Sequence, residues 1–157
     1  MRLALFEPDI PQNVGAMLRL CACLGVPLDV IEPCGFAFDD RKLRRVAMDY
    51  TDKATLARHL SWDAFLQSHA EKGERGRLVL LSTKAKILYT NFTFASNDTL
   101  LLGRESAGVP ETVHAKMDAR LKIPMREGLR SLNIGFAAAM AIGGALRQTA
   151  GFPESAQ

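Results

Sequence analysis

Apolar residues in this chain fall into short unbroken runs and into longer stretches with an apolar residue every three or four positions. The unbroken runs predict buried strands, because turn residues bound each of them. The expected strands cover residues 2–6, 28–33, 78–83, 98–103 and 120–124, with a further edge strand at 91–94. The periodic stretches predict helices over 13–25, 39–50, 61–70, 110–117 and 131–150.

The first predicted helix has a clear apolar side and recognisable ends. Its stripe consists of Val14, Met17, Leu18, Cys21 and Leu24. Asn13 is the expected N-cap, and Gly25 is the expected end signal. Strands that are apolar throughout and alternate with helices predict a largely parallel sheet with helices on both faces. We therefore expect one α/β domain over 1–157, with a core at about 2–150 and a tail at 151–157.

Composition narrows the class of protein. The 157 residues carry a formal net charge of +3, and 48% of them are hydrophobic, as in ordinary globular proteins. No apolar run approaches the roughly 20 residues that span a bilayer, and the N-terminus does not resemble a secretion signal, so a cytoplasmic protein without a membrane partner is expected. Cys21, Cys23 and Cys34 are expected to be reduced thiols. No metal site is predicted.

Three expected strands end in unusual loops, at residues 80–83, 101–110 and 122–133. In a parallel sheet, ligands bind beyond the carboxyl ends of the strands, so these loops could form one pocket for an adenosine-like molecule. Each loop by itself is better explained as a tight turn with a helix cap, because glycine turns are common. The glycine motifs of dinucleotide sites and of P-loops do not occur.

Two further patterns suggest contact with a polar partner. Asn13, Gly15 and Arg19 form N-x-G-x-x-x-R at a helix start, and we expect Gly15 and Arg19 to face away from the apolar stripe. A basic cluster suited to RNA phosphates consists of Arg41, Lys42, Arg44 and Arg45. A capped helix with a solvated arginine, and a solvated basic face, remain the plainer alternatives. The chain's histidines, His59, His69 and His114, are scattered and receive no role.

Four motifs in this order resemble the SPOUT class of RNA 2′-O-methyltransferases: "FEPDIPQNVGAMLRLCACLG", "IEPCGFAFDDRKLRRVAMDY", "LLGRESAGVP" and "IPMREGLRSLN". More narrowly, they resemble the small tRNA enzymes that methylate the wobble ribose of the anticodon, on cytidine or uridine. The resemblance implies an α/β fold with a C-terminal trefoil knot. It also implies S-adenosylmethionine in the knotted loops, S-adenosylhomocysteine as product, and a homodimer with the site near its interface. The implied nucleic-acid partner is a tRNA anticodon stem-loop, not DNA.

The resemblance also assigns residues. The implied cofactor-binding residues are Leu81, Thr83, Gly103, Ile123, Met125, Ser131, Leu132 and Asn133. Asn13, Arg19 and Glu105 are the implied catalytic residues, and Arg19 also serves the RNA with the basic cluster. Gly135 departs from relatives that have a small polar residue there.

The chemistry leaves several alternatives open. A guanidinium stays protonated, so Arg19 is expected to stabilise the developing alkoxide, while a phosphate oxygen, Glu105 or water accepts the proton. Methylation of another RNA, such as ribosomal RNA, and non-catalytic RNA binding remain alternative functions. Larger relatives that act on ribosomal RNA have an N-terminal extension, which we do not expect in this chain.

Overall fold

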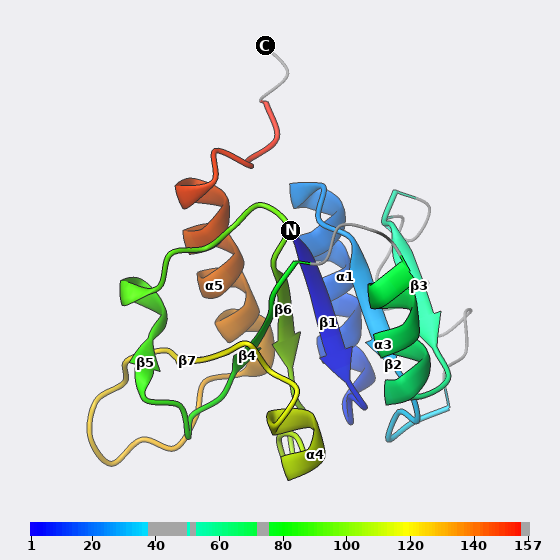
Figure 1. Ribbon diagram of the computed structural model, residues 1–157, viewed down its shortest axis with the longest axis horizontal. Coiled ribbons are helices and arrows are strands. Elements are labelled where there is room, and N and C mark those ends of the chain that lie inside the picture. Colours follow the sequence, from blue (N-terminus) through cyan, green and yellow to red (C-terminus); the bar gives the residue numbers. More distant parts are fainter. Residues whose placement is uncertain (38–49, 51–52, 72–75, 155–157) are drawn as a thin grey trace.

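Seven strands form one sheet in the part of the chain that the computed structural model describes, namely residues 1–37, 50, 53–71 and 76–154 (Figure 1). The strands are β1 (Arg2–Phe6), β2 (Leu28–Ile31), β3 (Leu56–His59), β4 (Leu78–Leu81), β5 (Ile87–Leu88), β6 (Thr99–Leu102) and β7 (Ala119–Lys122). Their order is β3-β2-β1-β6-β4-β7-β5, and every neighbouring pair is parallel. The predicted α/β fold with a largely parallel sheet is confirmed.

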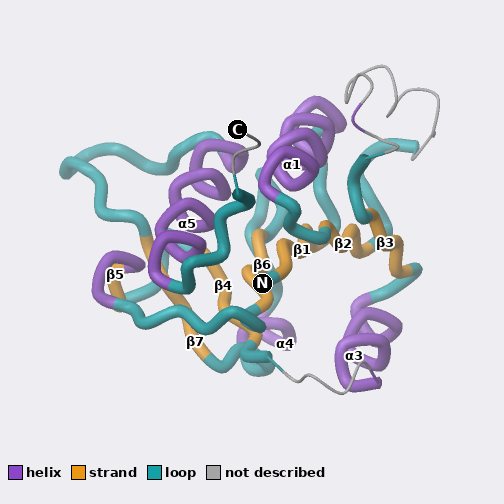
Figure 2. The backbone as a smooth tube through the Cα atoms, turned by 90° about the horizontal axis from the view of Figure 1, so that it is seen from above, coloured by secondary structure: helices purple, strands orange, loops and turns teal. Residues whose placement is uncertain are grey.

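Helices cover both faces of this sheet. The described helices are α1 (Pro11–Leu24), α3 (Trp62–Glu71), α4 (Glu111–His114) and α5 (Ile134–Gln148), with a 3-10 turn, η2 (Tyr89–Asn91). Figure 2 shows α1 and α5 on one side of the strands and α3 and α4 on the other. Parallel strands need crossover connections, and three of them contain a helix: α1 between β1 and β2, α3 between β3 and β4, and α4 between β6 and β7.

Alternation along each strand sends apolar side chains to both faces. In β1, Leu3 and Leu5 join the core under α1 and α5, whereas Ala4 and Phe6 join the core under α3 and α4. All four are buried, which explains why β1 has an unbroken apolar sequence instead of an alternating one.

The register aligns the carboxyl ends of the central strands. Leu102 at the end of β6 pairs with Leu5 of β1 on one side and with Leu81 of β4 on the other. Leu81 in turn pairs with Leu121 of β7. The loops that follow β1, β4, β6 and β7 therefore leave the sheet at the same edge.

Two short strands were not predicted, and one predicted strand is absent. Residues 91–94 form the end of η2 and a loop; the edge position belongs to the two-residue β5 instead. β3 is four residues long and includes Arg58 and His59, so its sequence carries little strand signal. Its pairing with β2 is a tertiary effect, supported by a 2.8 Å contact between His59 Nε2 and the carboxylate of Asp29, which is 1% exposed.

The ends of helices also differ from the prediction. α1 begins at Pro11 with Ile10 as N-cap, so the expected capping role of Asn13 is wrong. Pro11 supplies the fixed φ of a first helical position and needs no donor there, which leaves the Asn13 side chain for other partners. Gly15 is buried, contrary to the expectation that it faces away from the apolar side. Gly25 ends the helix at φ 65°, as predicted.

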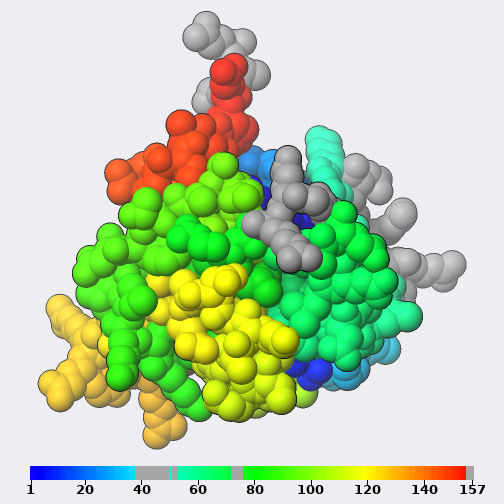
Figure 3. All heavy atoms as spheres, in the orientation of Figure 1, coloured from blue at the N-terminus to red at the C-terminus, as the bar shows by residue number. Residues whose placement is uncertain are grey.

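The last helix starts later than expected, at Ile134 instead of residue 131, because Asn133 is its N-cap. The Asn133 carboxamide oxygen accepts a hydrogen bond from the Gly135 N–H at 2.8 Å. Residues 131–133, which were expected in the helix, instead belong to a long loop that follows β7 and covers residues 123–133. In Figure 3 this loop is gold and projects from the body of the molecule.

Two expectations are not tested by this fold. The predicted basic helix at 39–50 lies almost entirely outside the described residues, and the knot implied by the resemblance stays a prediction. Among the described helices, none is long and apolar enough to cross a membrane.

Candidate functional site

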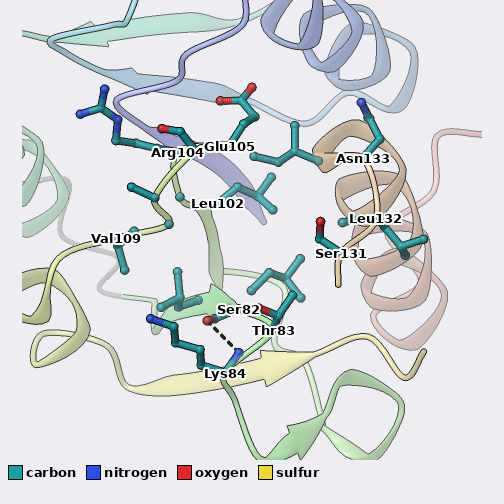
Figure 4. Close-up of a pocket in the computed structure, with 18 of the residues that line it drawn as sticks. Ser82, Thr83, Lys84, Leu102, Arg104, Glu105, Val109, Ser131, Leu132 and Asn133 are labelled. Atoms are coloured by element: carbon teal, nitrogen blue, oxygen red, sulfur yellow. Dashed lines mark hydrogen bonds between the residues drawn. The ribbon is translucent and has the colours of Figure 1, made fainter. Parts of the chain in front are cut away.

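A cavity of about 630 Å³ lies where the loops after β4, β6 and β7 meet (Figure 4). Its size is within the range of pockets that bind small molecules. Residues 80–84, 102–109, 123, 125 and 131–134 contribute to its walls, together with Ile10, Asn13, His114 and Ala137. The three loops singled out in the sequence therefore converge on one space, as expected from their places at the carboxyl ends of parallel strands.

All but one of the residues assigned to catalysis or cofactor binding line this cavity. They are Asn13, Leu81, Thr83, Gly103, Glu105, Ile123, Met125, Ser131, Leu132 and Asn133. Their separation along the chain reaches 120 residues, so the pocket brings together groups that only the fold makes neighbours. Whether each of them binds the cofactor remains a prediction.

A chain of hydrogen bonds connects the polar groups on one wall of the cavity. Asn13 Nδ2 donates to Glu105 Oε1 at 3.0 Å, and Asn133 Nδ2 donates to Asn13 Oδ1 at 3.2 Å. Because the Asn133 oxygen accepts from the Gly135 N–H, the orientation of both amides is determined. The other Glu105 oxygen, Oε2, accepts from the Asp9 N–H at 2.8 Å. Glu105 is thus held as an acceptor at both oxygens.

The residues after β6 form a tight loop, which we call the glycine loop (residues 103–108). The Arg104 N–H donates to the Gly108 carbonyl at 2.9 Å, and the Gly108 N–H donates to the Arg104 carbonyl at 2.8 Å. A Cβ on Gly103 would lie 2.5 Å from the Gly108 carbonyl carbon. Gly108 itself has φ +70°. The loop's own closure therefore requires Gly103, in addition to any clearance for a ligand.

Asp9, which follows β1, binds this loop from outside. Its Oδ1 accepts from Arg104 Nη2 at 2.9 Å, and its Oδ2 accepts from the Ser106 hydroxyl at 2.6 Å and the Ser106 N–H at 3.0 Å. The hydrogen bonds from Ser106, followed by those from Arg104, hold the pKa of the Asp9 carboxyl below its usual range. The hydrogen bond and the charge of Asp9, with a smaller contribution from Glu7 at 3.2 Å, raise the pKa of the Arg104 guanidinium.

Arg19 does not line the cavity. It lies six residues after Asn13 on α1, about 9 Å along the helix axis at 1.5 Å per residue. Its guanidinium lies over the Tyr50 ring, 5.0 Å from the centroid, and its side chain is exposed. The basic cluster at 41–45 lies outside the described residues.

Sequence reasoning missed several cavity residues, among them Ser82, Lys84, Arg104, Ser106 and His114. Ser82, Arg104 and Ser106 lie within the loops already singled out, although no role was assigned to them, and Lys84 directly follows the first of these loops. His114 belongs to the short helix α4, and no local pattern placed it at the site. Figure 4 shows Lys84 and Glu105 at opposite ends of the cavity, with Arg104 beside Glu105.

The lining suits a charged nucleoside better than a metal ion. Leu81, Leu102 and Ile123 provide apolar walls for a base or ribose, and Glu105 provides a negative charge for a cationic group such as a sulfonium. Within the described part of the chain, no group of three or more His, Cys, Asp and Glu could hold a metal. Burial raises the pKa of the Cys21 thiol to about 12 and that of Cys34 to about 11, so both stay protonated at neutral pH.

A protein-family model and named relatives match almost the whole chain. The model of the SpoU rRNA Methylase family matches residues 1–143. A protein of Beijerinckia indica named tRNA (cytidine(34)-2′-O)-methyltransferase is 61% identical over 146 residues, which is 93% of this chain and 90% of the relative.

Solved structures agree with these relatives. One described as "Structural insights into the 2-OH methylation of C/U34 on tRNA" is 39% identical, covers 94% of both chains and has a TM-score of 0.86. The methyltransferase AviRb of Streptomyces viridochromogenes, in complex with AdoMet, shares the fold at 24% identity, with a TM-score of 0.83 over 94% of this chain and 60% of that one. The resemblance stated from the motifs is confirmed: this chain belongs to the SpoU methylase family, within the SPOUT class of methyltransferases.

Proposed function

We propose that this protein transfers a methyl group from S-adenosylmethionine to the ribose 2′-oxygen of nucleotide 34, a cytidine or uridine, in the tRNA anticodon. The observation that carries the proposal is the single cavity formed by the loops after β4, β6 and β7, with one carboxylate on its wall. The names of relatives that match over nearly their full length support the tRNA substrate.

The cavity residues divide into two groups by chemistry. Leu81, Ile123 and Met125 offer apolar surface and main-chain polar groups to the adenosine, because a base edge pairs well with backbone N–H and C=O. Glu105, held by Asp9 and Asn13, offers negative charge to the cationic end of the cofactor. S-adenosylmethionine supplies a methyl already activated by the adjacent positive sulfur, so the protein has mainly to align donor and acceptor.

Arg19 serves the RNA side of the reaction. Its position outside the cavity, on the exposed side of α1, separates it from the cofactor residues. The attacking hydroxyl develops negative charge as it loses its proton, and a guanidinium beside it stabilises that charge without itself accepting the proton. Arg19 is therefore an electrostatic group for the alkoxide and the neighbouring phosphate.

The direct test is incorporation of labelled methyl from S-adenosylmethionine into tRNA, followed by mapping of the modified ribose. Arg19→Ala is expected to lower the rate at least about 100-fold while the Kd for the cofactor stays within about twofold, because Arg19 lies outside the cavity. Arg58→Ala, which removes an exposed arginine on the edge strand β3, away from both the cavity and α5, is the control. Loss of cofactor binding in step with activity would contradict the role given to Arg19. Absence of label in tRNA from the wild-type protein would favour non-catalytic RNA binding, and label at ribosomal RNA would redirect the substrate.

The basic cluster at 41–45 is proposed to bind tRNA phosphates. Each phosphate contact with single-stranded nucleic acid contributes about 0.7 to the slope of log K against log salt. Neutralising all four side chains is expected to reduce the slope by up to about 3. An unchanged slope would assign these residues to a solvated face. The four side chains are Arg41, Lys42, Arg44 and Arg45.

We also propose a homodimer that forms through α5. Phe136 and Met140 lie one turn apart on that helix and are 69% and 42% exposed, although both are apolar. Phe136→Glu is expected to shift the protein from dimer to monomer in light scattering coupled to size exclusion. Leu60→Glu is the matched control, because Leu60 is 82% exposed but lies in the connection from β3 to α3, and α3 covers the other face of the sheet from α5. A Phe136→Glu variant that remains a dimer would rule out this interface.

A further inference from the structure

Asp9 received no role in the sequence analysis. Among the hydrogen bonds of the described residues, it nevertheless makes more bonds to the glycine loop than any residue to which a role was assigned. Asp9 binds three consecutive loop residues, Arg104, Glu105 and Ser106. Its carboxylate receives two hydrogen bonds from the Arg104 guanidinium, at 3.2 and 2.9 Å, and two from Ser106, at 2.6 and 3.0 Å. Its own N–H donates to Glu105.

From these contacts we propose that Asp9 is a positioning residue that holds the glycine loop, and with it the Glu105 carboxylate, in the shape that binds S-adenosylmethionine. The inference rests on the proposed function and adds a residue to its site. Asp9 acts through the loop, because it does not itself line the cavity.

The backbone around Asp9 is itself fixed, which a positioning role requires. Glu7, two residues before Asp9, has φ 44°, a left-handed conformation that non-glycine residues rarely adopt. The Glu7 N–H donates to the Ile31 carbonyl at 2.9 Å, and the Pro8 carbonyl accepts from the Gly35 N–H at 2.9 Å. A Cβ on Gly35 would lie 3.0 Å from the Asp9 Cα, so the loop after β2 packs directly against Asp9. Strained backbone of this kind persists where the surrounding structure over-determines it.

The arrangement depends on the charge of Asp9 as well as on its shape. Four N–H and O–H donors point at its two oxygens, so both oxygens must be acceptors. An asparagine has the same shape but only one acceptor oxygen. In either orientation its NH2 group would face donors, from Arg104 or from Ser106. The loop would then lose at least one charge-assisted bond that holds its closed shape.

Loss of that bond is expected to lower the population of the binding-competent loop. The apparent Kd rises by the inverse of that population, so a fall to one tenth gives a tenfold weaker Kd, or about 1.4 kcal/mol. Saturating cofactor refills the competent state. We therefore expect Asp9→Asn to raise the Kd and the KM for S-adenosylmethionine at least about tenfold, with kcat for tRNA methylation at saturation within about threefold of wild type.

The experiment compares the Kd for S-adenosylmethionine, by calorimetry at 25 °C, in four variants of the full-length protein. Asp9→Asn is the test, and Ser106→Ala removes only one of the four donors, so a rise of about two- to fivefold is expected. The double variant should show less than the product of the two separate effects, because both act on the same bond. Glu32→Gln is the matched control: it removes a carboxylate that accepts two bonds from Arg58 and does not line the cavity.

Each outcome decides the proposal. A raised Kd in Asp9→Asn and Ser106→Ala, coupled in the double variant and absent from Glu32→Gln, supports it. An unchanged Kd with a lowered unfolding midpoint would make Asp9 a merely structural residue and overturn it. A large fall in kcat at saturating cofactor would also overturn it, because it would indicate direct participation. If Asp9→Asn does not fold, an unchanged Kd in Ser106→Ala refutes the proposal by itself. Wild-type protein that binds the cofactor without methylating tRNA would contradict the proposed function and leave this test intact.

Discussion

Gly103 is the position where a single methyl group should have the largest effect on the site. In Gly103→Ala, the new Cβ would lie 2.5 Å from the Gly108 carbonyl carbon and 2.8 Å from its oxygen and Cα. Carbon atoms in contact prefer about 3.5 Å, so the loop must open by about 1 Å. The two backbone bonds between Arg104 and Gly108 do not survive such a shift. Overpacking of about 1–3 kcal/mol and about 1 kcal/mol for each of the two bonds predict a destabilisation of about 3–5 kcal/mol.

The measurement is the free energy of unfolding in urea, with Gly108→Ala as the matched control. Gly108 lies in the same loop, but a Cβ there meets no atom within 4 Å. Its φ of +70° makes alanine cost about 1 kcal/mol. Gly103→Ala should therefore be less stable than Gly108→Ala by about 2–4 kcal/mol. If the two variants were equally stable, or if Gly103→Ala were the more stable, the close approach of the two loop ends would be wrong.

The remaining predictions concern ionisation. Because the pKa of Asp9 is lowered by Ser106 and Arg104, its stabilising effect is complete above the unfolded-state pKa of about 3.9 and is lost as pH falls through the folded value. The difference in unfolding free energy between wild type and Asp9→Asn should stay constant from pH 7 to about 5 and shrink below about pH 4. A difference that grows on acidification would contradict a lowered pKa of Asp9 in the folded protein. Cys21, buried and with a pKa raised to about 12, should resist iodoacetamide at pH 8 while exposed Cys23 is labelled first, as peptide mass spectrometry would show; preferential labelling of Cys21 would refute its burial.

The sequence by itself determined the class of fold and the region of the site. Residues 3–6, 78–81 and 100–102 are apolar at every position, which is typical of strands covered on both faces, and this pattern predicted the parallel sheet. The carboxyl ends of parallel strands lie at one edge of the sheet, so the sequence alone predicts that the three loop motifs lie together. The order of the motifs was enough to identify the family.

Only the tertiary structure decided which side chains meet within that region. Asn13 looked like a helix cap in the sequence, but it contacts Glu105 and Asn133, which lie 92 and 120 residues away. Asp9 carried no local signal, because its role consists entirely of bonds to residues 95 or more positions later. The short strand β3 likewise exists through pairing with β2 and not through its own propensity. The spacing of apolar residues indicates which side of a single helix or strand is buried. Hydrogen bonds between loops depend instead on the register of strands that are far apart in the sequence. That register is established only when the whole sheet is assembled.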